Sequence, residues 1–167
     1  KEKNIDVEHY IVSSGLTNMI EGCSFFNELN RVYACEYIFK NGRGLWPKLS
    51  VNYSNKVQFL YRIHKGAFEV SDQEGVNEKK YFGDHIHVPF ENMIFFGDGE
   101  TDVPTFNVLN KNNGKSICIY EDKNQKSIDI AKKLFSDGRI HHLVKNDYQE
   151  NSEVDVLVKE IIKSKSN

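Results

Sequence analysis

The feature that most restricts the fold of this chain is a continuous apolar run, Met-Ile-Phe-Phe at residues 93–96, followed at once by a polar loop at residues 97–102. Such a run is typical of a strand buried on both faces, and strands of that kind occur in parallel sheets covered by helices. Two further β-prone runs, residues 116–120 and 140–144, flank a helical pattern at residues 125–136. This alternation predicts an α/β fold with a Rossmann-like parallel sheet and helices on both faces.

The carboxyl-terminal segment carries the clearest helix signal in the chain. Ser152 and Asp155 have the spacing of a capping box, in which a serine side chain and an acidic side chain satisfy the first N–H groups of a helix. An apolar stripe at helical spacing follows them. We therefore expect a final helix that packs one face on the sheet through Val154, Leu157, Val158, Ile161 and Ile162.

The first half of the chain also reads as strands and helices, with a β-hairpin between them. The turn signal of the hairpin is Asn-Gly-Arg-Gly at residues 41–44. A helix is expected at residues 55–65, where Ser54 is suited to cap the start and Gly66 to end it. The other expected elements are a strand at residues 9–13, a helix around Leu16, Met19 and Ile20, hairpin strands at residues 31–39 and 49–53, and a short helix at residues 76–81.

Length and composition indicate an ordinary globular protein. The chain has 167 residues, of which 39% are apolar and 28% charged, so we expect a single core domain over residues 1–167. With a formal charge of -2, the chain has no net positive charge that would attract the phosphate backbone of nucleic acid. No apolar run approaches the ~18 residues that a membrane span needs. We therefore expect neither nucleic acid nor a membrane as a partner.

The cysteines indicate a reducing compartment. Cys23, Cys35 and Cys118 are odd in number, form no Cys-x-x-Cys pair and lie in largely apolar surroundings. Reduced core thiols of this kind are usual in the cytoplasm. The first residues contain no apolar signal core and no initiator methionine, so we expect a cytoplasmic chain that begins within a longer protein or after processing.

Two aspartates follow the buried strand at the position where parallel sheets carry their sites. Asp98 and Asp102 lie four residues apart in a glycine-containing loop. Carboxylates combined with waters and phosphate oxygens are what Mg²⁺ requires, so the pair is a candidate metal site. The alternative interpretation is a polar turn in which the aspartates cap the helix that begins near Val103.

Two further residues are candidates for binding a phosphoryl group. Ser13 ends the first expected strand, where its hydroxyl and the N–H groups of the next helix can hold an anion. Its alternative role is an ordinary helix N-cap. Lys56 lies in the first turn of a helix, an unfavourable place for a cation unless a negative partner is present. A solvated surface lysine is the alternative, and Lys65 is a weaker candidate for the same role.

Taken in order, these motifs resemble the haloacid dehalogenase-like (HAD) hydrolase superfamily, closest to its phosphoserine-phosphatase-like branch. The resemblance rests on Ile-Val-Ser-Ser-Gly ending at Gly15, on Lys56, and on Met-Ile-Phe-Phe-Gly-Asp-Gly-Glu-Thr-Asp ending at Asp102. It implies a Mg²⁺-dependent phosphatase acting on a small phosphorylated metabolite. By the resemblance, Ser13 and Lys56 bind the phosphoryl group, Asp98 ligates Mg²⁺, and Asp102 holds the waters of the metal.

The first motif of that family, Asp-x-Asp at the end of an apolar strand, is absent from this chain. That motif supplies the aspartate nucleophile. The resemblance therefore implies an incomplete core domain whose nucleophile comes from a missing N-terminal segment or a second chain, and residues 1–167 alone are expected to be inactive. The cap domain of the branch is expected to be missing as well. The alternative is a non-catalytic module of the same fold that binds a phosphorylated ligand or a metal.

Two other conspicuous groups receive structural interpretations. His85 and His87 have the spacing of a metal pair, but without further ligands they are expected to be surface residues. Trp46 is expected to be a packing anchor at the end of the hairpin. A nucleotide-binding Rossmann domain is disfavoured because no glycine-rich phosphate-binding motif is present.

Overall fold

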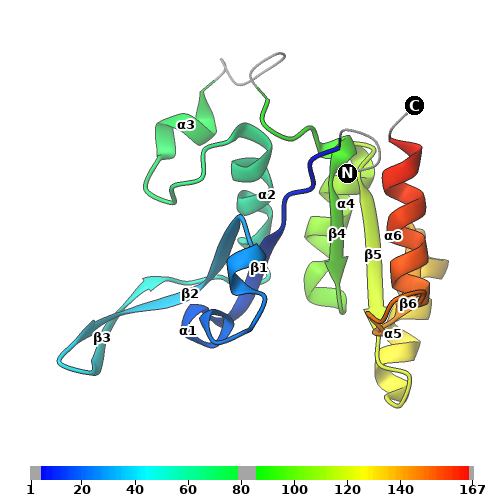
Figure 1. The fold of residues 1–167 in the computed structure, drawn as a ribbon, viewed down its shortest axis with the longest axis horizontal. Helices are drawn as coiled ribbons and strands as arrows, with labels where there is room; N and C mark the ends of the chain where they lie inside the picture. Colours follow the sequence, from blue (N-terminus) through cyan, green and yellow to red (C-terminus); the bar gives the residue numbers. More distant parts are fainter. Residues whose placement is uncertain (1–4, 79–85, 166–167) are drawn as a thin grey trace. The chain divides into compact units, whose positions relative to one another are not determined.

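The computed structural model describes residues 5–78 and 86–165 (Figure 1). The chain divides into two compact units, residues 1–59 and residues 60–167, and each is described by itself. The expectation of one domain over residues 1–167 stays a prediction.

The first unit contains a three-stranded sheet of order β1-β2-β3 (Figure 1). Strand β1 (Tyr10–Leu16) runs parallel to β2 (Arg31–Lys40), and β2 runs antiparallel to β3 (Arg43–Leu49). The connection between β1 and β2 holds the short helix α1 (Thr17–Glu21) and the 3-10 turn η1 (Phe26–Glu28). In the core of this unit, the ring of Tyr33 stacks on Phe59 with their centroids 4.7 Å apart.

The expected hairpin is confirmed, but its second strand begins earlier than the sequence suggested. Asn41 and Gly42 have φ angles of 51° and 74°, the left-handed pair that a two-residue hairpin turn requires. The chain therefore resumes pairing at once, and Lys40 lies opposite Arg43. Pro47 is tolerated within β3 because β3 is at the edge of its sheet.

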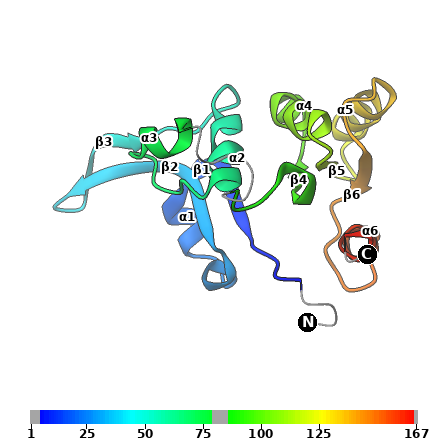
Figure 2. The ribbon, with the colours of Figure 1, turned by 90° about the horizontal axis from the view of Figure 1, so that it is seen from above.

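The second unit is built around a parallel sheet of order β4-β5-β6. Its strands are β4 (Ile94–Gly97), β5 (Lys115–Tyr120) and β6 (His142–Lys145). Figure 2 shows α4 (Val103–Lys111) and α5 (Gln125–Ser136) on one face and α6 (Glu153–Ser164) on the other. The unit therefore has the expected α/β arrangement of a parallel sheet between two layers of helices.

Each face of the parallel sheet has its own apolar core. On one face, Phe106 of α4 and Leu134 of α5 pack around Cys118. On the other, Val154 and Ile161 of α6 pack on β5 and β6. The side chain of Ser152 accepts the N–H of Asp155, which confirms the serine cap and, with the packing above, the apolar stripe of the final helix. The Asp155 carboxylate accepts the N–H of Asn151 and not that of Ser152, so the second bond of the predicted capping box is wrong.

Helix α2 (Lys56–Lys65) confirms the expected helix and its end at Gly66, which has a φ of 69°. The Ser54 hydroxyl bonds to Oδ1 of Asn52 and not to a helix N–H, so its expected capping role is wrong. A short helix, α3 (Gln73–Asn77), precedes the expected position at residues 76–81, because the Asp72 carboxylate caps it by accepting the N–H of Gly75 at 2.8 Å. Residues 79–81 lie outside the described residues. The 3-10 turn η3 (Phe90–Asn92) leads into β4.

All three cysteines are free thiols, and only Cys118 is fully buried. Within residues 5–78 and 86–165, no helix combines the length and apolarity needed to cross a membrane. The cytoplasmic location stays a prediction.

Candidate active site

The loop after β4 is organised by Asp102. The turn η4 (Glu100–Asp102) connects this loop to α4, and Asp102 is only 2% exposed. Its Oδ2 accepts the backbone N–H of Asp98 at 3.1 Å. Helix α4 does begin at Val103, but the Asp102 side chain makes no capping hydrogen bond to it. The alternative interpretation of Asp102 as a side-chain cap is therefore wrong, and the residue instead holds the Asp98 loop.

Gly97 is required because the last residue of β4 lies against this buried carboxylate. A Cβ atom built at Gly97 would lie 2.6 Å from Oδ2 of Asp102 and 2.6 Å from Cζ of Phe106. Such distances are too short for any real side chain, so residue 97 admits only glycine without a shift of its neighbours. The close packing fixes the point from which the Asp98 loop leaves the sheet.

The negative charges of Asp98 and Asp102 affect the thiol of Cys118 on the neighbouring strand β5. Cys118 lies beside Gly97 in the register of β4 and β5 and is fully buried. Burial, followed by the charges of Asp98 and Asp102, raises the pKa of the Cys118 thiol to about 11. This thiol therefore stays protonated at neutral pH and is unsuited to be a nucleophile.

Asp98 is the residue of the pair that is open to a ligand. Its side chain is exposed, and the described residues supply no hydrogen-bond or ion-pair partner for its carboxylate. Within residues 5–78 and 86–165, no group of three or more His, Cys, Asp or Glu side chains is arranged to hold a metal. The assignment of Mg²⁺ to Asp98 and Asp102 therefore stays a prediction.

Tyr148 is a neighbour of Asp98 that sequence reasoning missed. It follows β6 at the carboxyl edge of the parallel sheet, the edge at which Asp98 also lies. Burial and the negative charge of Asp98 raise the pKa of the Tyr148 phenol. Its position depends on the path of the loop after β6, for which the sequence contains no motif.

Ser13 lies where the regular pairing of β1 is interrupted. Val12 pairs with Tyr33, but the next paired residue of β1 is Leu16, so the chain bulges between them. The strand therefore continues past Ser13, where the sequence suggested that it ends. The Ser13 Oγ accepts the N–H of Gly15 at 3.0 Å, which leaves its own O–H proton available to donate. The alternative role of Ser13 as a helix N-cap is wrong, because the N-cap of α1 is Leu16.

Lys56 is the first residue of α2, as expected, and is half-buried. Lys65, the weaker candidate, lies in the last turn of α2 and donates a hydrogen bond to the Val76 carbonyl. Ser13 and Lys56 belong to the first unit, and Asp98 and Asp102 belong to the second. That all four serve one phosphoryl site stays a prediction.

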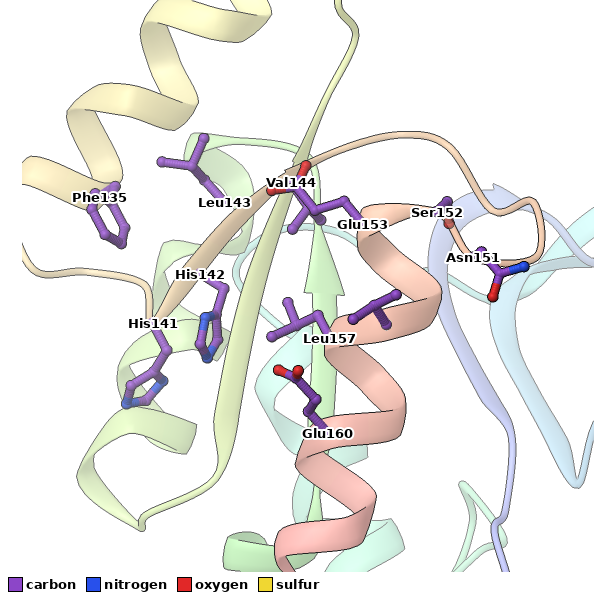
Figure 3. A pocket seen from close by; sticks show the side chains of 11 residues that line it. Phe135, His141, His142, Leu143, Val144, Asn151, Ser152, Glu153, Leu157 and Glu160 are labelled. Carbon is purple, nitrogen blue, oxygen red and sulfur yellow. The ribbon is translucent and has the colours of Figure 1, made fainter.

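A pocket of about 480 Å³ lies along β6 and α6 (Figure 3), and neither Asp98 nor Asp102 lines it. Its titratable side chains are His141, His142, Glu153 and Glu160, and its apolar lining includes Leu143 and Leu157. The Nδ1 atom of His141 accepts the backbone N–H of Ser116 at 3.3 Å, so this ring stabilises the sheet.

The other histidine pair is only partly described, because His85 lies outside the described residues. The backbone N–H of His87 donates to the His64 carbonyl at 2.9 Å, and its ring meets Phe68 edge-on with the centroids 5.0 Å apart. His87 is exposed, so the expectation that it is a surface residue is confirmed.

Comparison with known proteins gives one relative. An uncharacterized protein of Borreliella burgdorferi is 27% identical to this chain over 168 residues, which cover 89% of this chain and 55% of that protein. The chain thus spans about half the length of the curated relative that it matches. No family model matches the chain, and no solved structure matches it.

Proposed function

We propose that residues 1–167 form part of the core domain of a Mg²⁺-dependent phosphomonoester hydrolase of the HAD-like type. The observation that carries the proposal is the Asp98 loop. One aspartate is buried and holds the loop through a backbone N–H, while the other presents an exposed carboxylate at the carboxyl end of a parallel strand. Ligand sites of open α/β sheets lie at this edge.

The residues of the chain are assigned to binding and positioning. Asp98 would hold the metal, which on binding would neutralise charge on the phosphoryl oxygens. Asp102 would keep the Asp98 loop in place through its hydrogen bond at 3.1 Å. The hydroxyl of Ser13 and the ammonium group of Lys56 would bind the phosphoryl group of a small phosphorylated metabolite. None of these four groups is assigned to attack phosphorus.

The sheet edges support a nucleophile that comes from another segment. Among the described residues, β1 ends one sheet and β4 ends the other. Phe96 of β4 is also more exposed than a strand buried on both faces would allow. We propose that a strand carrying Asp-x-Asp, from an N-terminal segment or a second chain, pairs at one of these edges. Its carboxylate would attack phosphorus and displace the alcohol of the phosphomonoester, and water would then cleave the aspartyl-phosphate to release phosphate and restore the carboxylate.

The test is hydrolysis of a small aryl phosphate by the full-length protein with and without Mg²⁺, combined with calorimetric titration of Mg²⁺. We expect Mg²⁺-dependent turnover that Asp98→Asn abolishes, together with loss of Mg²⁺ binding. Asp129→Asn, which changes an exposed aspartate on α5, is the matched control and should leave both unchanged.

The alternative, a non-catalytic module of the same fold, has its own signature in this experiment. Mg²⁺ or phosphate would bind and depend on Asp98, but no turnover would appear in the full-length protein. Turnover that survives Asp98→Asn would instead contradict the assignment of the metal to this loop.

A further inference from the structure

The hairpin formed by β2 and β3 exposes an unusual concentration of large apolar side chains. Phe39 is 55% exposed and Trp46 is 71% exposed, and both lie near the turn of the hairpin. Tyr37, Ile38 and Leu45 are also exposed. Figure 1 shows this hairpin as a long arm that extends beyond β1 and α1 of the same unit. Trp46 is therefore not the packing anchor that the sequence suggested.

The apolar side chains occupy both faces of this hairpin. Ile38 lies opposite Trp46 in the register, which places these two side chains on one face. Tyr37 and Phe39 alternate with Ile38 along β2 and therefore lie on the other face. A strand pair that docks on a flat protein surface needs only one apolar face. Two apolar faces better suit insertion at the boundary between lipid headgroups and acyl chains, where lipid contacts both faces.

The charge of the distal part of the hairpin has a single sign. Residues 37–48 contain Lys40, Arg43 and Lys48 and no acidic residue. Lys48 is paired with Glu36 at 2.8 Å, near the base. Lys40 and Arg43 face each other across the turn, and the described residues supply no carboxylate partner for either. The end of the arm is therefore positive, although the whole chain has a formal charge of -2.

We propose that this hairpin is a membrane contact that inserts its tip into the headgroup region of an anionic lipid bilayer. Aromatic rings beside lysine and arginine are the side chains that prefer the membrane interface, and the positive tip matches an anionic surface. Aliphatic Ile38 and Leu45 favour lipid over nucleic acid, since they cannot stack on bases. Our expectation of no membrane partner rested on the lack of a spanning segment, which such a surface contact does not need.

The experiment uses Trp46, which is the only tryptophan in the chain. The full chain is titrated with vesicles of phosphatidylcholine alone and of phosphatidylcholine mixed with phosphatidylserine, while tryptophan emission and its quenching by iodide are recorded. We expect a shift of the emission to shorter wavelength and protection from iodide with the anionic vesicles only.

Two sets of variants that keep Trp46 test the two parts of the contact. Lys40→Gln and Arg43→Gln should each weaken binding about fivefold, the effect of one basic residue at an anionic surface. Phe39→Ser should weaken it at least about tenfold through lost apolar burial. Lys132→Gln on α5 and Tyr53→Ser outside the hairpin are exposed controls and should leave binding unchanged.

Several results would overturn the proposal. Trp46 emission that is already blue-shifted and shielded from iodide without vesicles would show that protein covers the hairpin. Equal binding to neutral vesicles, or binding that Phe39→Ser leaves intact, would exclude a charged and apolar contact at this site. A larger response to a single-stranded oligonucleotide than to anionic vesicles would identify nucleic acid as the partner instead.

Discussion

The backbone N–H of Asp98 donates to Oδ2 of Asp102 at 3.1 Å, and this bond gives the two aspartates different tasks. Asp102 is buried and its carboxylate holds the loop, whereas the carboxylate of Asp98 is exposed. A sequence spacing of four residues suggests two equivalent metal ligands. The geometry instead makes one aspartate a support for the loop that carries the other.

Substitution of the two aspartates should therefore have unequal effects on stability. Asp102→Ala leaves the Asp98 N–H without its acceptor beside a buried gap, which should cost about 1–3 kcal/mol of unfolding free energy. Asp98→Ala should change it by less than about 0.5 kcal/mol, because that side chain is exposed. Urea unfolding followed by circular dichroism measures both. Faster amide hydrogen exchange at residue 98 in Asp102→Ala would locate the effect, and equal stability of the two variants would contradict it.

The glycines on either side of Asp98 provide a second contrast. Gly97→Ala would bring a Cβ to 2.6 Å from Oδ2 of Asp102 and from Phe106, so we expect a loss of about 1–3 kcal/mol. Gly99 has no atom within 4 Å of its built Cβ and has an extended φ of 176°. Gly99→Ala should therefore be neutral or slightly stabilising. Thermal unfolding of the two variants checks this, and similar losses for both would show that the packing around Gly97 is looser than described.

Helix caps, apolar periodicity and turn residues could be recognised in the sequence because each determines the structure of only a few neighbouring residues. The cap at Ser152 and the stripe that follows it gave the last helix, and the apolar run at residues 93–96 gave β4 to within one residue. Asn41-Gly42 gave the turn of the hairpin. The start of β3 was misplaced because a two-residue turn forces pairing to resume at Arg43, whatever the β-propensity of the residues there.

What depended on tertiary contacts could not be read from the sequence. The burial of Asp102 and the hydrogen bond it accepts follow from the way α4 returns to the end of β4. The proximity of Tyr148 to Asp98 depends on the loop after β6. Trp46 was expected to be buried because tryptophan usually is, but the hairpin extends away from the core that would have covered it.

Arg62 should be one of the most sensitive positions in the second unit. It is 3% exposed, and its guanidinium donates to the carbonyls of Ala67, Glu69, Val70 and Asp72 at 2.6–3.2 Å. The single ammonium group of lysine cannot donate hydrogen bonds to all four carbonyls. Arg62→Lys should therefore lower the free energy of unfolding by at least about 2 kcal/mol.

The control for Arg62 is Arg139→Lys, at a half-exposed arginine that is 4.0 Å from Asp137. It should change stability by less than about 0.5 kcal/mol. Chemical unfolding measures both variants, and hydrogen exchange should show faster opening of residues 67–72 only in Arg62→Lys. If both variants keep the same free energy of unfolding, the hydrogen bonds donated by Arg62 contribute little to stability.

The pocket histidines should make stability fall as the solution becomes acidic. Burial, and then the positive charge of Lys115, lowers the pKa values of His141 and His142 below 6.5. The unfolded chain therefore binds protons first, and stability present above about pH 6.5 is lost as pH falls through the lowered values. Protonation of Nδ1 would also remove the acceptor of the Ser116 N–H. The carboxyl groups of Asp122 and Asp155, whose pKa values are lowered from 3.8, act only at lower pH.

Urea unfolding at a series of pH values from about 7.5 to about 5 tests the histidine effect. His141→Asn can keep an acceptor for the Ser116 N–H but cannot titrate, so it should reduce the loss of stability across this window. His9→Asn, at an exposed histidine in the first unit, is the control and should leave the slope unchanged. An unchanged slope in His141→Asn would assign the acid sensitivity to other groups.

The last prediction separates binding from turnover in residues 1–167. We expect these residues alone to release no phosphate from an aryl phosphate, because Ser13 and Lys56 are assigned to hold the phosphoryl group, Asp98 is assigned to the metal, and no residue is assigned to attack phosphorus. Strands β1 and β4 end their sheets, so each offers backbone groups to an added strand. A domain or peptide containing an apolar strand that ends in Asp-x-Asp should therefore bind and restore Mg²⁺-dependent phosphate release. The same peptide with both aspartates changed to Asn should still bind but restore nothing, which separates pairing from chemistry. Robust turnover by residues 1–167 without any addition would show that the nucleophile lies within the chain and that the proposed mechanism is wrong.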